Sequence, residues 1–175
     1  MLATPTTFTQ FSESNPCAGC PAPCCQMQLI PYRTPKTFME VDHVRYLLLF
    51  PGTEMAVTTN GDWFYLRWAQ CQEFDSEGCL CKVHHTPQQP RICFTYNAYD
   101  CWYKRNFVTD APPNLYRLNL ERFNVWVQAI LFDEAGQIAQ APPFEDAQAI
   151  VKEIAIRPSF QAQASTIALE DIRVA

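Results

Sequence analysis

Apolar and polar positions alternate most clearly over residues 54–69 of this chain. Met55 and Val57 lie on one side of an extended segment, and the alternation resumes after Asn60-Gly61. An Asn-Gly pair between two alternating segments is typical of a tight turn, because both residues tolerate positive φ angles. The pattern therefore predicts a β-hairpin over residues 54–69.

A first helix is predicted over residues 36–49. Thr34 and Pro35 precede it as an N-cap and a first-turn proline, and apolar residues then recur at helical spacing. Pro51-Gly52 ends the pattern. We expect this helix to pack one apolar face against the rest of the fold.

Two further helices are predicted in the last third of the chain. Asn114 is a plausible N-cap for an apolar stripe that runs from Tyr116 to Ile130, with Gly136 as the stop. The second helix opens at Pro142-Pro143 and ends at Arg157-Pro158. We expect both helices to pack on the preceding part of the chain.

Together these elements predict an α+β fold. A cysteine-rich domain with a β-hairpin and short helices is expected over residues 15–110, and residues 111–175 are expected to be its helical extension. Residues 1–14 are polar, rich in Thr and Ser, and expected to be flexible. The chain has 175 residues of which 48% are hydrophobic, which suits one globular domain.

The charge balance, the N-terminal segment and the longest apolar run indicate which partners and which compartment to expect. The chain has 13 Lys and Arg against 18 Asp and Glu and no basic stripe, which argues against a nucleic-acid partner. The N-terminus has neither the basic nor the apolar segment of a secretory signal. The longest strongly apolar run, 46–50, is far shorter than the ~20 residues that cross a bilayer. We expect a cytoplasmic protein without a membrane partner.

Nine cysteines are the main departure from an ordinary composition. An odd count without a secretory signal fits a disulfide framework poorly. Cys17-x-x-Cys20-x-x-x-Cys24-Cys25 places four thiols in a segment rich in proline, where no regular helix or central strand can form. Two cysteines separated by two residues can direct both sulfurs at one ion, as in zinc and iron–sulfur sites. We therefore expect a metal site here.

The second half of the chain adds Cys71, Cys79, Cys81, Cys93 and Cys101. Four ligands close one tetrahedral site, so the chain has more thiols than a single ion needs. Two zinc sites could use eight of them, whereas one cluster with four ligands would leave several unused. In an extended segment the side chains of Cys24 and Cys25 diverge, so one of them would serve a second ion, bridge two ions or lie in the core.

Other readings of these residues stay open. Cys17 and Cys20 could form a redox dithiol, although the strand–helix junction typical of that motif is missing. His84 and His85 follow Cys81 closely enough to ligate, although paired loop histidines are more often solvated. No Gly-rich phosphate loop, nucleophile elbow or zinc-protease motif is present, so the sequence favours a role other than catalysis.

The ordered combination of cysteines resembles the YkgJ-type CxxCxxCC proteins, which are described as zinc- or iron-chelating domains. The hairpin with Asp62-Trp63, Gly78 and Pro90-x-x-Cys93 belongs to the resemblance, which covers residues 15–105. At His84, Gln89 and Phe94 the chain differs from the residues usual in the family. These differences put in doubt any function shared with the family through the loop around Pro90. On this resemblance the metal ligands are Cys17, Cys20, Cys24, Cys25, Cys71, Cys81, Cys93 and Cys101, and Cys79 is the extra thiol.

Three functions are therefore expected, in order. The first is an intracellular protein that chelates zinc or iron, including an iron–sulfur centre, with the metal mainly organising the structure. The second is a redox or enzymatic iron–sulfur protein. The third is an interaction module in which the stripe from Tyr116 to Ile130 docks a protein partner and the metal domain is a scaffold.

Overall fold

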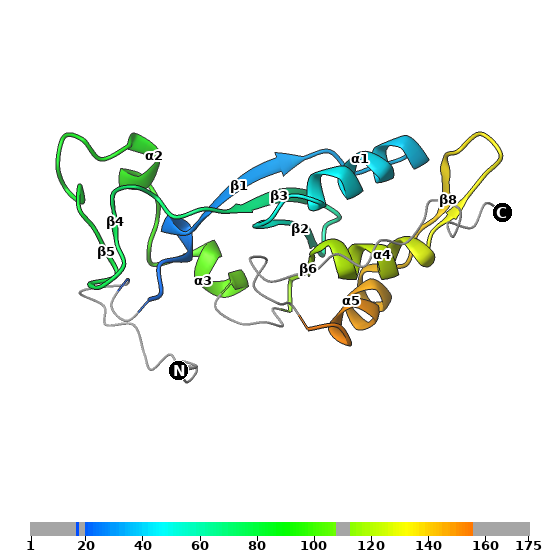
Figure 1. The fold of residues 1–175 in the computed structure, drawn as a ribbon. Coiled ribbons are helices and arrows are strands. Elements are labelled where there is room, and N and C mark those ends of the chain that lie inside the picture. Colours follow the sequence, from blue (N-terminus) through cyan, green and yellow to red (C-terminus); the bar gives the residue numbers. More distant parts are fainter. Residues whose placement is uncertain (1–16, 18–19, 108–112, 156–175) are drawn as a thin grey trace. The chain divides into compact units, whose positions relative to one another are not determined.

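The computed structural model describes residue 17, residues 20–107 and residues 113–155 (Figure 1). The fold is mixed α+β with small antiparallel sheets, as the sequence predicted. Two compact units divide the chain. The cysteine-rich unit consists of Met1–Met27 and Gln70–Thr109, and the core unit consists of Gln28–Ala69 and Asp110–Ala175. Each unit is thus built from two separate stretches of sequence.

A four-stranded sheet forms the centre of the core unit, with strand order β1-β3-β2-β6 (Figure 1). Strands β2 and β3 form the predicted hairpin, in which Met55 pairs with Tyr65, and Gly61 has the positive φ of 80° that its turn requires. Strand β6 pairs antiparallel with the other side of β2. The strands are β1 (Met27–Tyr32), β2 (Thr53–Thr58), β3 (Trp63–Trp68) and β6 (Leu115–Leu118).

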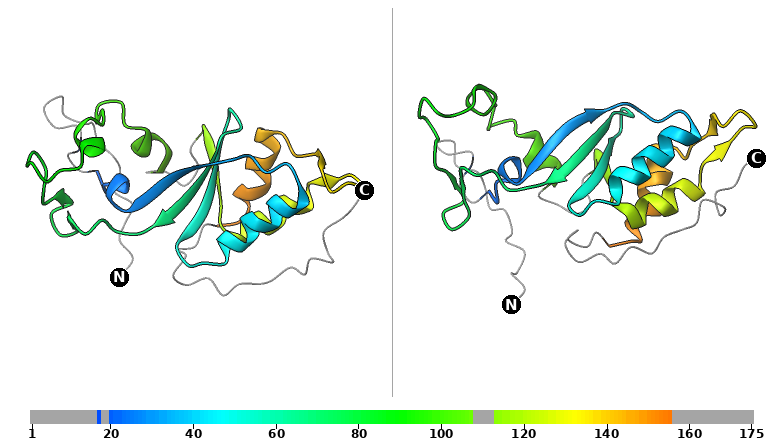
Figure 2. Two further views of the ribbon diagram at one scale, coloured as in Figure 1. Left: turned by 90° about the horizontal axis from the view of Figure 1, so that it is seen from above. Right: turned by 45° about the horizontal axis from the view of Figure 1, so that its top comes forward.

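Among the described residues, the core unit also has three helices: α1 (Phe38–Leu48), α4 (Leu120–Gln128) and α5 (Phe144–Lys152) (Figure 2). Helix α4 packs against α1 and α5, and α1 and α5 also contact β2 and β6, respectively. Their inner faces bury large apolar side chains, among them Val44, Phe123 and Val151. Burial of a Phe or Val side chain contributes about 1.5–3 kcal/mol, so this cluster is the main source of stability in the unit.

The first and last of the three predicted helices are confirmed, with different ends. Helix α1 begins after Thr37, whose hydroxyl accepts a hydrogen bond from the Glu40 N–H at 3.2 Å. Thr37, and not Thr34, is therefore the N-cap. Helix α5 begins after Pro143 as expected, but the predicted end at Arg157-Pro158 lies outside the described residues.

The predicted helix from Asn114 begins too early. Residues Leu115–Leu118 form strand β6, because their backbone pairs with β2 in a register that places Leu118 opposite Met55. The helix starts only after Asn119, whose side chain accepts a hydrogen bond from the Arg122 N–H at 2.9 Å. Gly136 does not end this helix either; with a φ of 71° it forms the turn between β7 (Leu131–Phe132) and β8 (Ile138–Gln140).

One buried ion pair crosses the sheet from β2 to β6. The Arg117 guanidinium donates to both carboxylate oxygens of Glu54, at 2.7 and 3.0 Å. Both side chains are almost fully buried, and the guanidinium also lies over the Trp68 ring at 5.2 Å. Either charge buried without its partner would destabilise the fold, because it would be removed from water without compensation. The bidentate hydrogen bonds supply that compensation for both side chains.

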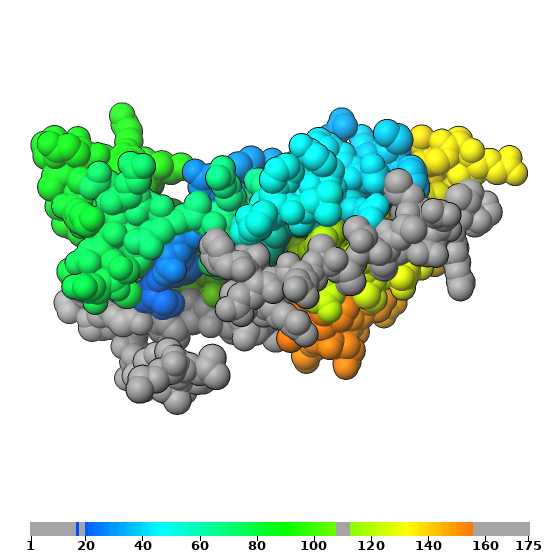
Figure 3. Space-filling view, viewed as in Figure 1, coloured from blue at the N-terminus to red at the C-terminus, as the bar shows by residue number. Residues whose placement is uncertain are grey.

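The cysteine-rich unit contains only short elements among its described residues. They are the 3₁₀ helix η1 (Pro23–Cys25), β4 (Phe74–Asp75), β5 (Leu80–Cys81), α2 (Arg91–Phe94) and α3 (Trp102–Phe107). Short helices were predicted for this region, whereas the two short strands were not. Figure 3 shows the second stretch of this unit, in green, with much of its chain at the surface. Several of its large apolar side chains are exposed, including Leu80, Ile92 and Tyr99.

Candidate metal centre

All nine cysteines belong to the cysteine-rich unit, and all are among the described residues. Four come from the stretch that ends at Met27 and five from the stretch that begins at Gln70. The fold therefore brings together two groups of thiols that the hairpin segment separates in sequence. The structure holds them as thiols, of which Cys20 and Cys101 are buried.

The first group lies on a compact turn followed by η1. The Cys20 N–H donates to the Cys17 carbonyl at 3.0 Å, which closes the turn between these two cysteines. Ala22 then adopts a left-handed φ of 52°, and the Cys25 N–H donates to its carbonyl at 2.9 Å. Cys24 and Cys25 thus lie on a 3₁₀ helix, where successive side chains point about 120° apart because the helix has three residues per turn.

Cys101 joins this first group because helix α3, which it precedes, packs against η1. Its thiol lies close enough to Cys20 and Cys24 to influence the pKa of each. Burial raises the pKa of Cys20, and the nearby Lys104 ammonium partly offsets that effect. A cation beside a buried thiol favours the thiolate, which is the form that binds metals.

A tyrosine hydroxyl contacts the Cys101 sulfur. Tyr96 donates to this sulfur at 3.6 Å and accepts a hydrogen bond from the Trp102 N–H at 3.0 Å. Partial burial and the bond to Cys101 raise the pKa of Tyr96 to about 12, so the hydroxyl stays protonated and remains a donor at neutral pH. Hydrogen bonds of this kind orient a sulfur ligand and tune the metal that it holds.

The second group assembles around the backbone of Cys25. The Cys71 N–H donates to the Cys25 carbonyl at 2.8 Å, and the Phe74 N–H donates to the Cys71 carbonyl at 3.1 Å. Phe74 in β4 in turn pairs with Cys81 in β5. Cys93 follows on α2, and burial together with the thiols of Cys25, Cys81 and Cys71 raises its pKa.

The adjacent pair Cys24 and Cys25 connects the two groups. The Cys24 thiol donates a hydrogen bond to the Cys25 sulfur, which lowers the pKa of Cys25 to about 7. The same bond, with burial, raises the pKa of Cys24. This hydrogen bond therefore favours ionisation of Cys25 over ionisation of Cys24.

The turn between β4 and β5 explains the position of Gly78. A Cβ atom at this residue would come within 3.0 Å of an Asp75 carboxylate oxygen and within 3.3 Å of Leu80. The glycine thus permits the close turn that places Cys81 opposite Phe74. The extra thiol, Cys79, is exposed on the same turn.

The remaining candidate ligands are placed differently. His84 and His85 are exposed with ring centroids 4.0 Å apart, and His84 Nδ1 lies 3.3 Å from the Gln89 amide nitrogen. Among the described residues, no three side chains of Cys, His, Asp or Glu converge closely enough to hold an ion. Backbone contacts thus hold the cysteines near one another, but their sulfur atoms do not converge on a common point.

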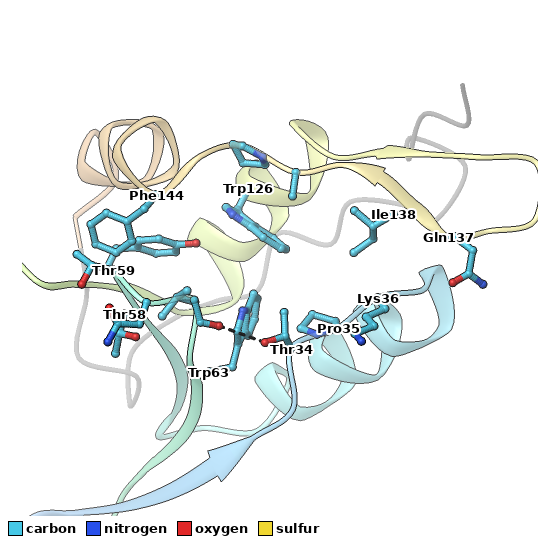
Figure 4. Close-up of a pocket in the computed structure, with 16 residues that line it drawn as sticks. Thr34, Pro35, Lys36, Thr58, Thr59, Trp63, Trp126, Gln137, Ile138 and Phe144 are labelled. Atoms are coloured by element: carbon cyan, nitrogen blue, oxygen red, sulfur yellow. Dashed lines mark hydrogen bonds between the residues drawn. The ribbon is translucent and has the colours of Figure 1, made fainter.

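A separate cavity of about 680 Å³ lies in the core unit and was not foreseen from the sequence (Figure 4). Trp63 and Trp126 meet in its wall edge to face, with ring centroids 5.2 Å apart, and Thr34 donates to the Gly61 carbonyl at 3.1 Å. The described residues that line it include no Cys, His, Asp or Glu, so they supply neither metal ligands nor a carboxylate or imidazole base. Its lining comes from distant segments, which is why no local pattern indicated it.

Comparison with known proteins found no matching family model, curated protein or solved structure. The resemblance to the YkgJ-type proteins stays a prediction. No helix among the described residues is long and apolar enough to span a membrane.

Proposed function

We propose that this chain is an intracellular metal-binding protein whose cysteine-rich unit chelates zinc or iron, with the metal mainly organising that unit. The proposed ligands are the eight thiols of Cys17, Cys20, Cys24, Cys25, Cys71, Cys81, Cys93 and Cys101. The observation that carries the proposal is the concentration of all nine cysteines in one unit that contains little apolar core.

The balance of burial supports a structural role for the metal. Every residue of the hydrophobic core cluster belongs to the core unit. In the cysteine-rich unit, two of the few buried side chains, Cys20 and Cys101, are themselves proposed ligands. A small unit without sufficient core usually needs disulfides or a metal, and structural zinc supplies about 10–16 kcal/mol in small domains.

The chemistry of the donors also suits these metals. Thiolates select zinc and iron over hard cations such as magnesium and calcium. Because the sulfurs do not converge in the structure, binding has to turn several of them toward a common point. Binding also has to release thiol protons, and the Lys104 charge near Cys20 favours that release at one of the proposed ligands.

Metal content of anaerobically purified full-length protein tests the proposal. We expect stoichiometric zinc or iron, and we expect Cys71→Ser to lower the bound amount. Cys79→Ser is the matched control, because Cys79 is another exposed cysteine of the same unit but lies outside the proposed set. Wild-type protein that holds neither metal and titrates as nine ordinary thiols would contradict the proposal.

A redox iron–sulfur centre is the second candidate, and the contact between Tyr96 and the Cys101 sulfur favours it. A hydrogen bond to a ligating sulfur is one of the features that set cluster potential. The anaerobic protein should then be brown and bleach on reduction, and Tyr96→Phe should lower its potential. A colourless sample with stoichiometric zinc would exclude this candidate.

The interaction-module alternative was based on the apolar stripe from Tyr116 to Ile130. Tyr116, Phe123 and Ile130 of the apolar stripe are buried in the core of their own unit. Tyr116 belongs to β6, and only the later part of the stripe is helical. The stripe therefore packs inside the core unit and does not present a docking face.

A further inference from the structure

The two groups of thiols differ in how the backbone holds them. One group is joined to the turn before η1 and to the start of α3, and the other is joined to the β4–β5 hairpin. From this arrangement we propose that the eight cysteines form two separate four-thiolate sites. Site A consists of Cys17, Cys20, Cys24 and Cys101, and site B consists of Cys25, Cys71, Cys81 and Cys93. This inference rests on the proposed metal-binding function.

The adjacent pair Cys24 and Cys25 divides the sites. Both residues lie on η1, so their side chains leave the backbone about 120° apart. Cys24 lies on the helix against which α3 packs, near Cys101, whereas the carbonyl of Cys25 accepts the Cys71 N–H at 2.8 Å. In this structure the Cys24 thiol donates to the Cys25 sulfur, so assigning the two residues to different sites requires metal binding to break this hydrogen bond.

Site B is held together by consecutive backbone contacts. They run from Cys25 to Cys71, from Cys71 to Phe74, and from Phe74 across the strand pair to Cys81. The thiol of Cys93 lies within electrostatic range of those same three cysteines. Four thiolates complete one tetrahedral site and leave no open position for substrate.

Site A is held together by a turn and a packed helix. The Cys20 N–H donates to the Cys17 carbonyl at 3.0 Å, and the packing of α3 on η1 brings Cys101 to the same place. Cys20 lies within electrostatic range of both Cys17 and Cys101. Lys104, one turn along from Cys101, adds a positive charge that offsets part of the charge of a four-thiolate site.

Cadmium NMR and metal counting on the full-length chain test the division. Cadmium is the probe because it replaces zinc or iron at thiolate sites and reports each site as its own resonance. We expect two equivalents and two resonances, both in the range of four-sulfur coordination. One resonance, or one equivalent, in wild-type protein would overturn the two-site proposal while leaving metal binding intact; no bound metal at all would overturn the proposed function instead.

Paired variants assign the ligands. Cys20→Ser with Cys101→Ser should remove one equivalent and one resonance, and Cys71→Ser with Cys93→Ser should remove the other. Cys79→Ser should keep both. If each double variant loses both resonances although its core unit stays folded by circular dichroism, the thiols form one shared cluster and the division into sites is wrong.

Discussion

The two units of this chain are stabilised in different ways. The core unit has a four-stranded sheet and three helices of 9 to 11 residues, with Phe123 and Leu118 completely buried. The cysteine-rich unit has strands of two residues and helices of at most six among its described residues. It contains all nine cysteines, whereas the core unit contains none.

The difference shows what a short segment needs in order to hold a shape. Regular elements bury apolar faces, and their stability grows with the area removed from water. Short irregular segments cannot bury enough apolar area and depend on cross-links between side chains. We therefore expect the two units to respond separately to metal removal and to core mutation.

Metal removal should produce the largest effect, and only in the cysteine-rich unit. A strong chelator added to metal-loaded protein should remove about 10 kcal/mol of stabilisation from this unit, because coordination and folding are coupled there. Hydrogen exchange read by mass spectrometry should show protection lost over residues 20–27 and 70–107 and retained in β2 and β3. Unchanged exchange in both units of verified metal-free protein would argue against a structural metal.

Phe123→Ala should destabilise the core unit and leave metal binding by the cysteine-rich unit unchanged. Phe123 is completely buried in the core cluster, and deletion of such a side chain costs about 3–5 kcal/mol through lost burial and the cavity left behind. Urea unfolding followed by tryptophan fluorescence should show the loss, while metal content per folded molecule stays at the wild-type value. A simultaneous loss of metal would mean that the two units do not fold independently.

Glu54→Gln should destabilise the core unit by about 3 kcal/mol, because it leaves the buried Arg117 guanidinium without its countercharge. Thermal unfolding checks the loss. Glu40→Gln is a matched control, since Glu40 pairs with Arg33, whose side chain is 77% exposed. Such surface pairs contribute little, because water screens both charges. Equal effects of the two substitutions would contradict the assigned burial.

Tyr116→Phe should have the smallest effect on the free energy of unfolding, and this effect should appear only at alkaline pH. Burial raises its pKa above the ordinary value of about 10, so the unfolded chain releases this proton at lower pH than the folded one. The stabilisation from the neutral hydroxyl is complete below about pH 10 and is lost above it, at up to about 1.4 kcal/mol per pH unit. Tyr116→Phe should flatten the alkaline fall in the free energy of unfolding, and an identical slope in both proteins would refute the assignment.

Local sequence determined the elements whose signals lie within a few residues of one another. The Asn60-Gly61 turn specified the β2–β3 hairpin, and apolar spacing with nearby prolines specified α1 and α5. Cys17 and Cys20 are likewise joined locally, by a turn that their backbone hydrogen bond closes. Turn propensities and helical periodicity act over such short distances, and they can be read without knowing the fold.

Only the tertiary structure decided the features that depend on partners far apart in the chain. The stretch from Tyr116 fits helical spacing, yet Leu115–Leu118 becomes a strand because β2 offers an open edge with a complementary register. The Glu54–Arg117 pair and the aromatic cavity depend on the same long-range pairing. The grouping of Cys71 with Cys25 also follows from a backbone contact between two separate stretches. Residue pairs this distant meet only after the chain has folded, so no local pattern encodes them.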